Sequence, residues 1–189
     1  MTPILGIMAS QISGHLYAPT GSMYHIASTT LSTAAASVTF SSIPADYTHL
    51  QIRAIARTGR TGQNGDFFKT TFNADTASNY SWHLLTGDGA STGTGSGSSV
   101  AYMEANRFAS NSTSANIFGA IVLDILDYAN TNKYKTMRYL GGYDNNGSGE
   151  IQFGSGNWRS SSAITSITFT QSGAYNILQY STFTLYGVK

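Results

Sequence analysis

Two aspartates lie three residues apart in the stretch DILDYANTNKYK, which covers residues 124–135. Paired carboxylates can act as acid and base in hydrolysis when both reach the same substrate atoms. Here strand-like sequence flanks the segment ANTN, and a short Asn/Thr connection is typical of a β-hairpin. Side chains three apart in a strand point to opposite faces, so Asp124 and Asp127 should not converge. We therefore predict a hairpin with water-facing charges, in which Asp127 lies near Lys133 and Lys135.

The stretch DNNGSGE, residues 144–150, matches the opening of a calcium-binding loop. Its alternate residues carry side-chain oxygens, and its glycines permit a tight turn. The acid expected at the twelfth position is missing, because Ser155 stands there. Two interpretations stay open, a glycine-rich hairpin turn, which we favour, and a calcium site. The calcium site would use Asp144, Asn146, Ser148 and Glu150. Apart from calcium we expect no cofactor.

Other catalytic arrangements lack support in the sequence. The four histidines show no HxH or HExxH spacing, whereas a zinc site needs three or four converging ligands. No G-x-S-x-G stretch is followed by strand-to-helix signals. We therefore expect that the protein is not an enzyme.

Arginines gather only in QIRAIARTGR, which contains Arg53, Arg57 and Arg60. A nucleic-acid-binding protein normally carries a broad basic face, and this chain has a formal net charge of +1. We interpret the cluster as a solvated strand edge and expect no nucleic-acid partner.

Aromatic residues make up 12% of the chain, including twelve tyrosines. Exposed rings stack on sugars, but aromatic residues also dominate protein interfaces and ordinary cores. We place Trp82, Tyr143 and Trp158 beside the DNNGSGE stretch at one end of the fold, as contacts to a host glycan or to a protein partner. The core or interface interpretation is favoured over the glycan.

The elements that must position these residues are strands. Runs rich in Val, Ile, Thr, Tyr and Phe alternate with Gly, Ser, Asn and Asp from about residue 23 onward. This pattern predicts an all-β, antiparallel, jelly-roll-like β-sandwich over residues 17–189. Residues 87–99, GDGASTGTGSGSS, predict an exposed and mobile loop.

Residues 1–16 differ from the rest and form a predicted docking arm whose apolar side needs cover. We assign its docking side chains to Ile4, Leu5, Ile7, Met8, Ile12 and Leu16. No apolar run approaches the roughly 20 residues of a membrane helix, so we expect no membrane association. The opening also lacks the positive segment of a secretion signal.

The composition favours durable contacts over electrostatic steering. Charged residues make up 10% of the chain, against roughly 25% in an average protein. Hydroxyl and amide side chains supply the remaining polarity, which suits contacts with proteins or sugars. Cysteine is absent, so no disulfide forms.

Three parts of the sequence resemble small virion proteins of tailed bacteriophages. They are the opening TPILGIMASQISGHL, the middle FSSIPADYTHLQIRAIAR with FNADTASNYSWHLLTGDG, and LDILDYANTNKYKT with GNWRSSSAITSITF and the ending FTLYGVK. The resemblance runs over most of the chain, in the same order. It implies a β-rich tail-fibre or appendage module, commonly a homotrimer, and it carries over no catalytic residue.

We therefore expect a virion structural protein, assembled with other virion proteins in the host cytoplasm and anchored by residues 1–16. Two alternatives stay open: a head-decoration protein on the capsid surface, and a glycan-binding adhesin module for host attachment.

Overall fold

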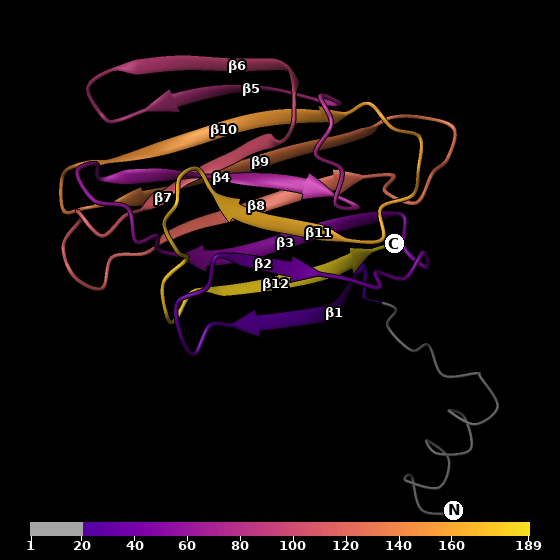
Figure 1. Cartoon of the computed structure of the whole chain (residues 1–189), viewed down its shortest axis with the longest axis horizontal. Coiled ribbons are helices and arrows are strands. Elements are labelled where there is room, and N and C mark those ends of the chain that lie inside the picture. Colours follow the sequence, from indigo (N-terminus) through magenta and orange to yellow (C-terminus); the bar gives the residue numbers. More distant parts are fainter. Residues whose placement is uncertain (1–20) are drawn as a thin grey trace, which may run out of the picture.

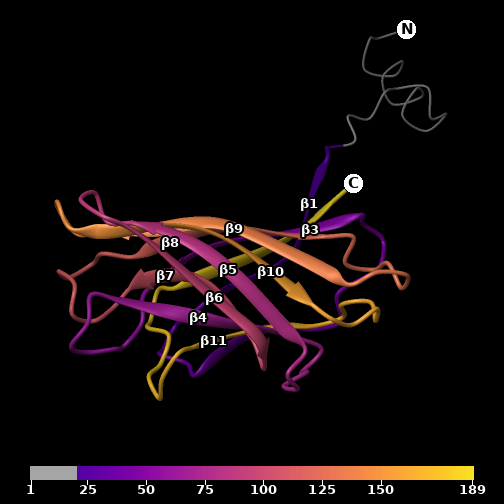
Figure 2. The same cartoon turned by 90° about the horizontal axis from the view of Figure 1, so that it is seen from above.

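A computed structural model describes residues 21–189, which form two antiparallel sheets packed face to face (Figure 1). The large sheet has eight strands in the order β1-β12-β3-β8-β9-β10-β5-β6, and the small sheet has four, β2-β11-β4-β7. Figure 2 shows the two layers, with β4 and β11 on one side and β8 and β9 on the other. The strands are β1 (Met23–Thr30), β2 (Ser37–Phe40), β3 (His49–Ala56), β4 (Gly65–Phe72), β5 (Tyr80–Gly87), β6 (Thr92–Val100), β7 (Met103–Ala109), β8 (Gly119–Leu126), β9 (Lys135–Asp144), β10 (Gly149–Trp158), β11 (Ile167–Gln171) and β12 (Thr182–Val188).

The arrangement confirms the predicted antiparallel β-sandwich, while jelly-roll connectivity stays a prediction. The predicted docking arm, residues 1–16, lies outside the described residues. Among residues 21–189, no helix has the length and apolar character needed to cross a membrane.

Strand β3 shows how the alternating pattern produces the core. Leu50, Ile52 and Ala54 are buried against the small sheet, while Arg53 between them is exposed. Because successive side chains in a strand point to opposite faces, one strand supplies both the core and the outer surface.

Aromatic rings fill the space between the sheets. Phe68 of β4 lies 4.3 Å from Phe108 and 5.8 Å from Phe183 of β12, measured between ring centroids. Phe169 of β11 packs on Phe183 at 5.6 Å. Tilted and offset rings at these distances are favoured over face-to-face sandwiches. Much of the aromatic content of the chain is therefore core.

The prediction of a loop over residues 87–99 is wrong for most of its length, because residues 92–100 form the edge strand β6. Glycine stands at every inward position of its TGTGSGS segment, and β6 pairs with β5 so that Gly97 lies opposite Trp82. A Cβ atom at Gly97 would lie 2.6 Å from Nε1 of Trp82. Because these glycines have no side chains, the inner side of β6 is flat, and the indole ring of Trp82 packs on it.

Candidate interaction surface on the large sheet

The outer faces of the two sheets differ in chemistry. On the small sheet, Thr39, Thr168 and Thr71 form a row across β2, β11 and β4. The hydroxyls of Thr39 and Thr168 are hydrogen-bonded at 3.0 Å. Such a polar face is usual for an antiparallel sheet that has one side in water.

The outer face of the large sheet carries large apolar side chains instead. Six of them are between 42% and 59% exposed and lie on five adjacent strands. We call this set the apolar face, and it consists of Ile55, Leu85, Val122, Leu140, Ile151 and Phe153.

Strand register joins these side chains into one surface. Leu140 lies opposite both Val122 and Phe153, and Phe153 lies opposite Leu85, so four apolar residues follow one another across the sheet. Ile151 stands one pleat further along the same side of β10. Neighbours at such positions touch across strands, so the row is continuous.

A hollow of about 640 Å³ opens on this face, over β8, β9, β10 and the end of β5. Ala120, Gly142 and Gly87 line it, and their small size leaves the space between the larger side chains. Gly142 cannot be replaced without strain, because a Cβ there would lie 2.2 Å from the carbonyl oxygen of Glu150. A smaller hollow of about 300 Å³ lies beside Arg53 and Ile55 and shares Ala120 with the first.

Opposite charges stand at the two ends of the apolar face. Arg53 lies at the β3 end, where its guanidinium sits 5.7 Å from the ring centroid of Tyr186. Asp88 and Asp144 are exposed at the other end and line the larger hollow. Within residues 21–189, none of the three forms an ion pair. Backbone N–H groups of Ala90 and Ser91 lower the pKa of Asp88 and keep it ionised.

The structure does not bring the predicted aromatic contact residues together. Trp82 lies opposite Gly156, near the end of β10, whereas Tyr143 lies opposite Glu150, near its beginning. Trp82 and Tyr143 are both half-buried. The predicted cluster at one end of the sandwich is therefore wrong.

Trp158 is a core residue. It is 2% exposed. Its ring stacks on that of Tyr80, with centroids 6.3 Å apart, and packs edge to face with that of Phe72, with centroids 5.7 Å apart. Its indole N–H donates to Oδ2 of Asp75 at 2.7 Å. The prediction that Trp158 contacts a glycan or partner is wrong, because no face of its ring is open.

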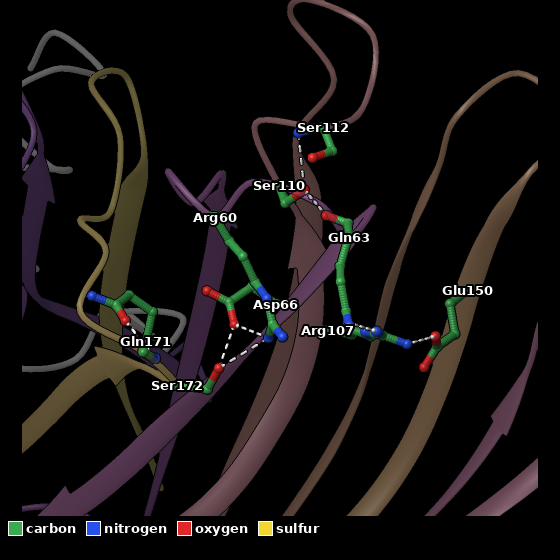
Figure 3. A network of polar contacts seen from close by, with 10 residues as sticks. Arg60, Gln63, Asp66, Arg107, Ser110, Ser112, Glu150, Gln171 and Ser172 are labelled. Carbon is green, nitrogen blue, oxygen red and sulfur yellow. Dashed lines mark hydrogen bonds and ion pairs between the residues drawn. The ribbon is translucent and has the colours of Figure 1, made fainter.

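The DNNGSGE stretch is a hairpin turn between β9 and β10, the interpretation favoured from the sequence, and three of its four candidate calcium ligands bind other groups of the protein. Glu150 points into the sandwich, where its carboxylate accepts from Arg107 at 2.7 Å (Figure 3). Oδ1 of Asp144 accepts from the backbone N–H of Asn146 at 2.8 Å and so closes the turn. Ser148 bonds within the turn, to Asn145. Among residues 21–189, no three acidic or histidine side chains gather to hold a metal.

The arginines of QIRAIARTGR do not share a surface. Arg57 is buried and donates to the carbonyls of Thr113, Ser114 and Ile117, so the solvated-edge interpretation is wrong for it. Arg60 binds the buried carboxylate of Asp66 at 3.0 Å, which also accepts from Ser172 (Figure 3).

The hairpin predicted over residues 124–135 is confirmed. Asp127 pairs with Lys133 across the turn, while Asp124 accepts from Gln51 at 2.9 Å and lies near Arg138 at 3.4 Å. The two carboxylates bind different partners and do not form an acid–base pair.

Lys135 of the same hairpin does not face water, contrary to the prediction. It is 0% exposed, and its ammonium donates to the carbonyl oxygens of Asn130, Lys133 and Ser161.

No protein-family model, no curated protein and no solved structure matches this chain. The apolar face is therefore characterised by its own geometry. Sequence analysis missed it, because Ile151 and Phe153 have the alternating spacing that normally marks a core-facing side. The one available signal was the pair of inward glycines, Gly154 and Gly156, which follow Phe153 on the opposite face of β10.

Proposed function

We propose that this chain is a non-enzymatic structural protein of a bacteriophage virion, whose sandwich binds neighbouring proteins through the apolar face. The observation that carries the proposal is the exposure of six large apolar side chains in one continuous surface. Contiguous apolar surface of this kind marks interaction sites, because leaving it in water is unfavourable.

The polarity of the chain supports the same function. Charged residues make up 10% of the sequence, and the apolar face itself contains none. The centres of protein interfaces are depleted of charge in the same way. A binding surface for a polyanion would require several basic side chains instead.

The virion assignment comes from the sequence resemblance. It favours a tail-fibre or appendage component, anchored by residues 1–16 to other virion proteins and assembled as a homotrimer in the host cytoplasm. A head-decoration protein is the second candidate, since the apolar face serves either position equally well. The adhesin function is not favoured, because Trp158 is buried and Trp82 packs on β6.

The location of the protein on particles tests this proposal. We would label the C-terminus with gold, since Lys189 follows the end of β12 that is far from Ile55 of the apolar face. We expect gold on the tail of intact particles. Gold spread over the head would favour the decoration function, and particles without gold would overturn the virion proposal.

Removing residues 1–16 tests the anchor. We expect a folded sandwich that no longer joins particles, because six large apolar side chains of the arm are lost. Circular dichroism and thermal unfolding establish that the shortened protein folds, and particle sedimentation measures incorporation. A shortened protein that incorporates normally would show that the anchor lies elsewhere.

A further inference from the structure

We propose that the apolar face is covered by a second copy of this chain, with the Arg53 end of one copy beside Asp88 and Asp144 of the other. This inference rests on the proposed function only in taking the apolar face as an interface. It goes further by naming the partner.

The extent of the apolar face suits association between copies. If a fully exposed large side chain presents roughly 150–250 Å², six at about half exposure present on the order of 450–750 Å². A typical stable interface buries about 800 Å² on each partner, including its polar rim. Arg53, Gln51, Asp88 and Asp144 lie around the apolar side chains and would supply such a polar rim.

The shape of the face is also suited to a copy of itself. An interface between identical chains must present both the protruding and the receiving part. The row Val122, Leu140, Phe153 and Leu85 stands beside the hollow lined by Ala120 and Gly142. The row of one copy can therefore enter the hollow of the next.

The charges around the face distinguish between possible partners better than its shape does. Arg53 stands at one end of the face and Asp88 and Asp144 at the other, and none of these three forms an ion pair within residues 21–189. Asp124 and Arg138, beside Val122 and Leu140, pair with each other at 3.4 Å and leave these three charges as the unpaired ones considered for a partner. A second copy matches both ends at once, since Arg53 of each copy meets Asp88 and Asp144 of another. An acidic partner would match only Arg53, a basic partner only the aspartates, and an anionic lipid surface would be repelled by them.

Sedimentation equilibrium of the full chain tests the partner. We expect the wild-type protein to be a dimer or trimer at micromolar concentration, and Leu140→Glu to be a monomer. Leu140 is 54% exposed at the centre of the face, so the substitution leaves the core intact. The matched control is Thr39→Glu, which places the same carboxylate on the exposed face of the small sheet and should not change the mass.

A charge exchange tests the alignment of the copies. Arg53→Glu alone and the pair Asp88→Arg with Asp144→Arg should each weaken association about tenfold or more, because like charges then meet. The combination of all three substitutions should restore it, since opposite charges meet again. A combined variant as weak as its parents would overturn the proposed alignment.

Two results would overturn the second-copy proposal. One is a wild-type chain that stays monomeric at all concentrations tested. The other is an oligomer that survives Leu140→Glu and dissociates when residues 1–20 are removed, which would assign assembly to the N-terminal segment. Neither result touches the gold-labelling experiment, so failure of this inference is distinguishable from failure of the virion proposal.

Discussion

At the scale of single residues, Lys135 shows how burial changes the role of a charge. Its ammonium is enclosed by three carbonyl oxygens, and burial lowers its pKa. Lys133, two positions earlier, is exposed and pairs with Asp127 in water. The two lysines of one hairpin thus offer a direct comparison between a structural cation and a surface ion pair.

We expect Lys135→Met to lower the free energy of unfolding by about 2–4 kcal/mol, because buried carbonyls lose their donor. Lys133→Met is the control, and it should leave stability nearly unchanged, since exposed ion pairs contribute little. Urea unfolding at neutral pH measures both. Equal losses in the two variants would show that Lys135 is not a structural cation.

Asp75 links the stability of the sandwich to pH. The amide of Asn79 lowers the pKa of Asp75 most, and the N–H groups of Trp158 and Ala77 lower it further. A carboxyl with a lowered pKa in the folded state stabilises the fold above its unfolded pKa of about 3.9. This stabilisation is lost as pH falls from there through the folded pKa.

We therefore expect the wild-type protein to lose stability more steeply below about pH 4 than Asp75→Asn does. Asp88 and Asp127 also have lowered pKa values, so the slope should decrease in the variant without vanishing. Unfolding midpoints between pH 5 and pH 2, compared on a common denaturant scale, measure the difference. Parallel profiles would contradict the role assigned to Asp75.

At the scale of elements, the glycines of β6 differ in how much room each leaves for a side chain, and Gly97 faces the indole ring of Trp82. A Cβ at Gly97 would lie 2.6 Å from Nε1 of Trp82, whereas a Cβ at Gly93 would lie 3.5 Å from the hydroxyl of Thr86, an ordinary contact. Both glycines occupy inward positions of the same strand. They therefore separate the effect of overpacking from that of adding a side chain to an edge strand.

We expect Gly97→Ala to destabilise the protein by about 1–3 kcal/mol through overpacking against Trp82. Gly93→Ala should be neutral or stabilising, because it restricts the unfolded chain. Thermal unfolding measures the stability, and tryptophan fluorescence reports the displaced ring. A destabilised Gly93→Ala would mean that β6 rejects any side chain, and the flat-surface explanation would fail.

The elements also show why sequence predicts some strands and not others. β3 follows the usual rule, so its buried residues could be assigned from alternation alone. In β10 the rule is inverted, with Ile151 and Phe153 outside and glycines inside. A Cβ at Gly156 would lie 2.5 Å from the sulfur of Met103 on β7. The approach of a strand distant in sequence decides this pattern, and no local periodicity reveals it.

At the scale of the whole molecule, association should couple to stability. If copies bind only in the folded state, the melting temperature must rise with protein concentration. We expect a rise for the wild-type chain over an about hundredfold increase in concentration and none for Leu140→Glu, measured by calorimetry. If the melting temperature rose equally with concentration in both proteins, the association would not depend on the apolar face.

The sandwich could be predicted from sequence because its core repeats one simple pattern over many strands. The interaction surface could not, because it depends on register. Leu140 and Phe153 are thirteen positions apart in the chain, and only the pairing of β9 with β10 makes them neighbours. The burial of Trp158 likewise depends on segments distant in sequence, those of Phe72 and Tyr80, and Ser161 supplies one of the three carbonyls around Lys135.

The pairing of β1 with β12 has a consequence for synthesis of the protein. The first described strand lies beside the last, and the backbone N–H of Lys189 reaches the carbonyl of Ser22 at 3.0 Å. β12 stands between β1 and β3 and is the last of the twelve strands to leave the ribosome. Until β12 emerges, β1 has no partner strand in the sheet and β3 has one side open. The large sheet is therefore completed only once β12 has been made, and until then the edges of β1 and β3 that β12 will cover stay open to chaperones.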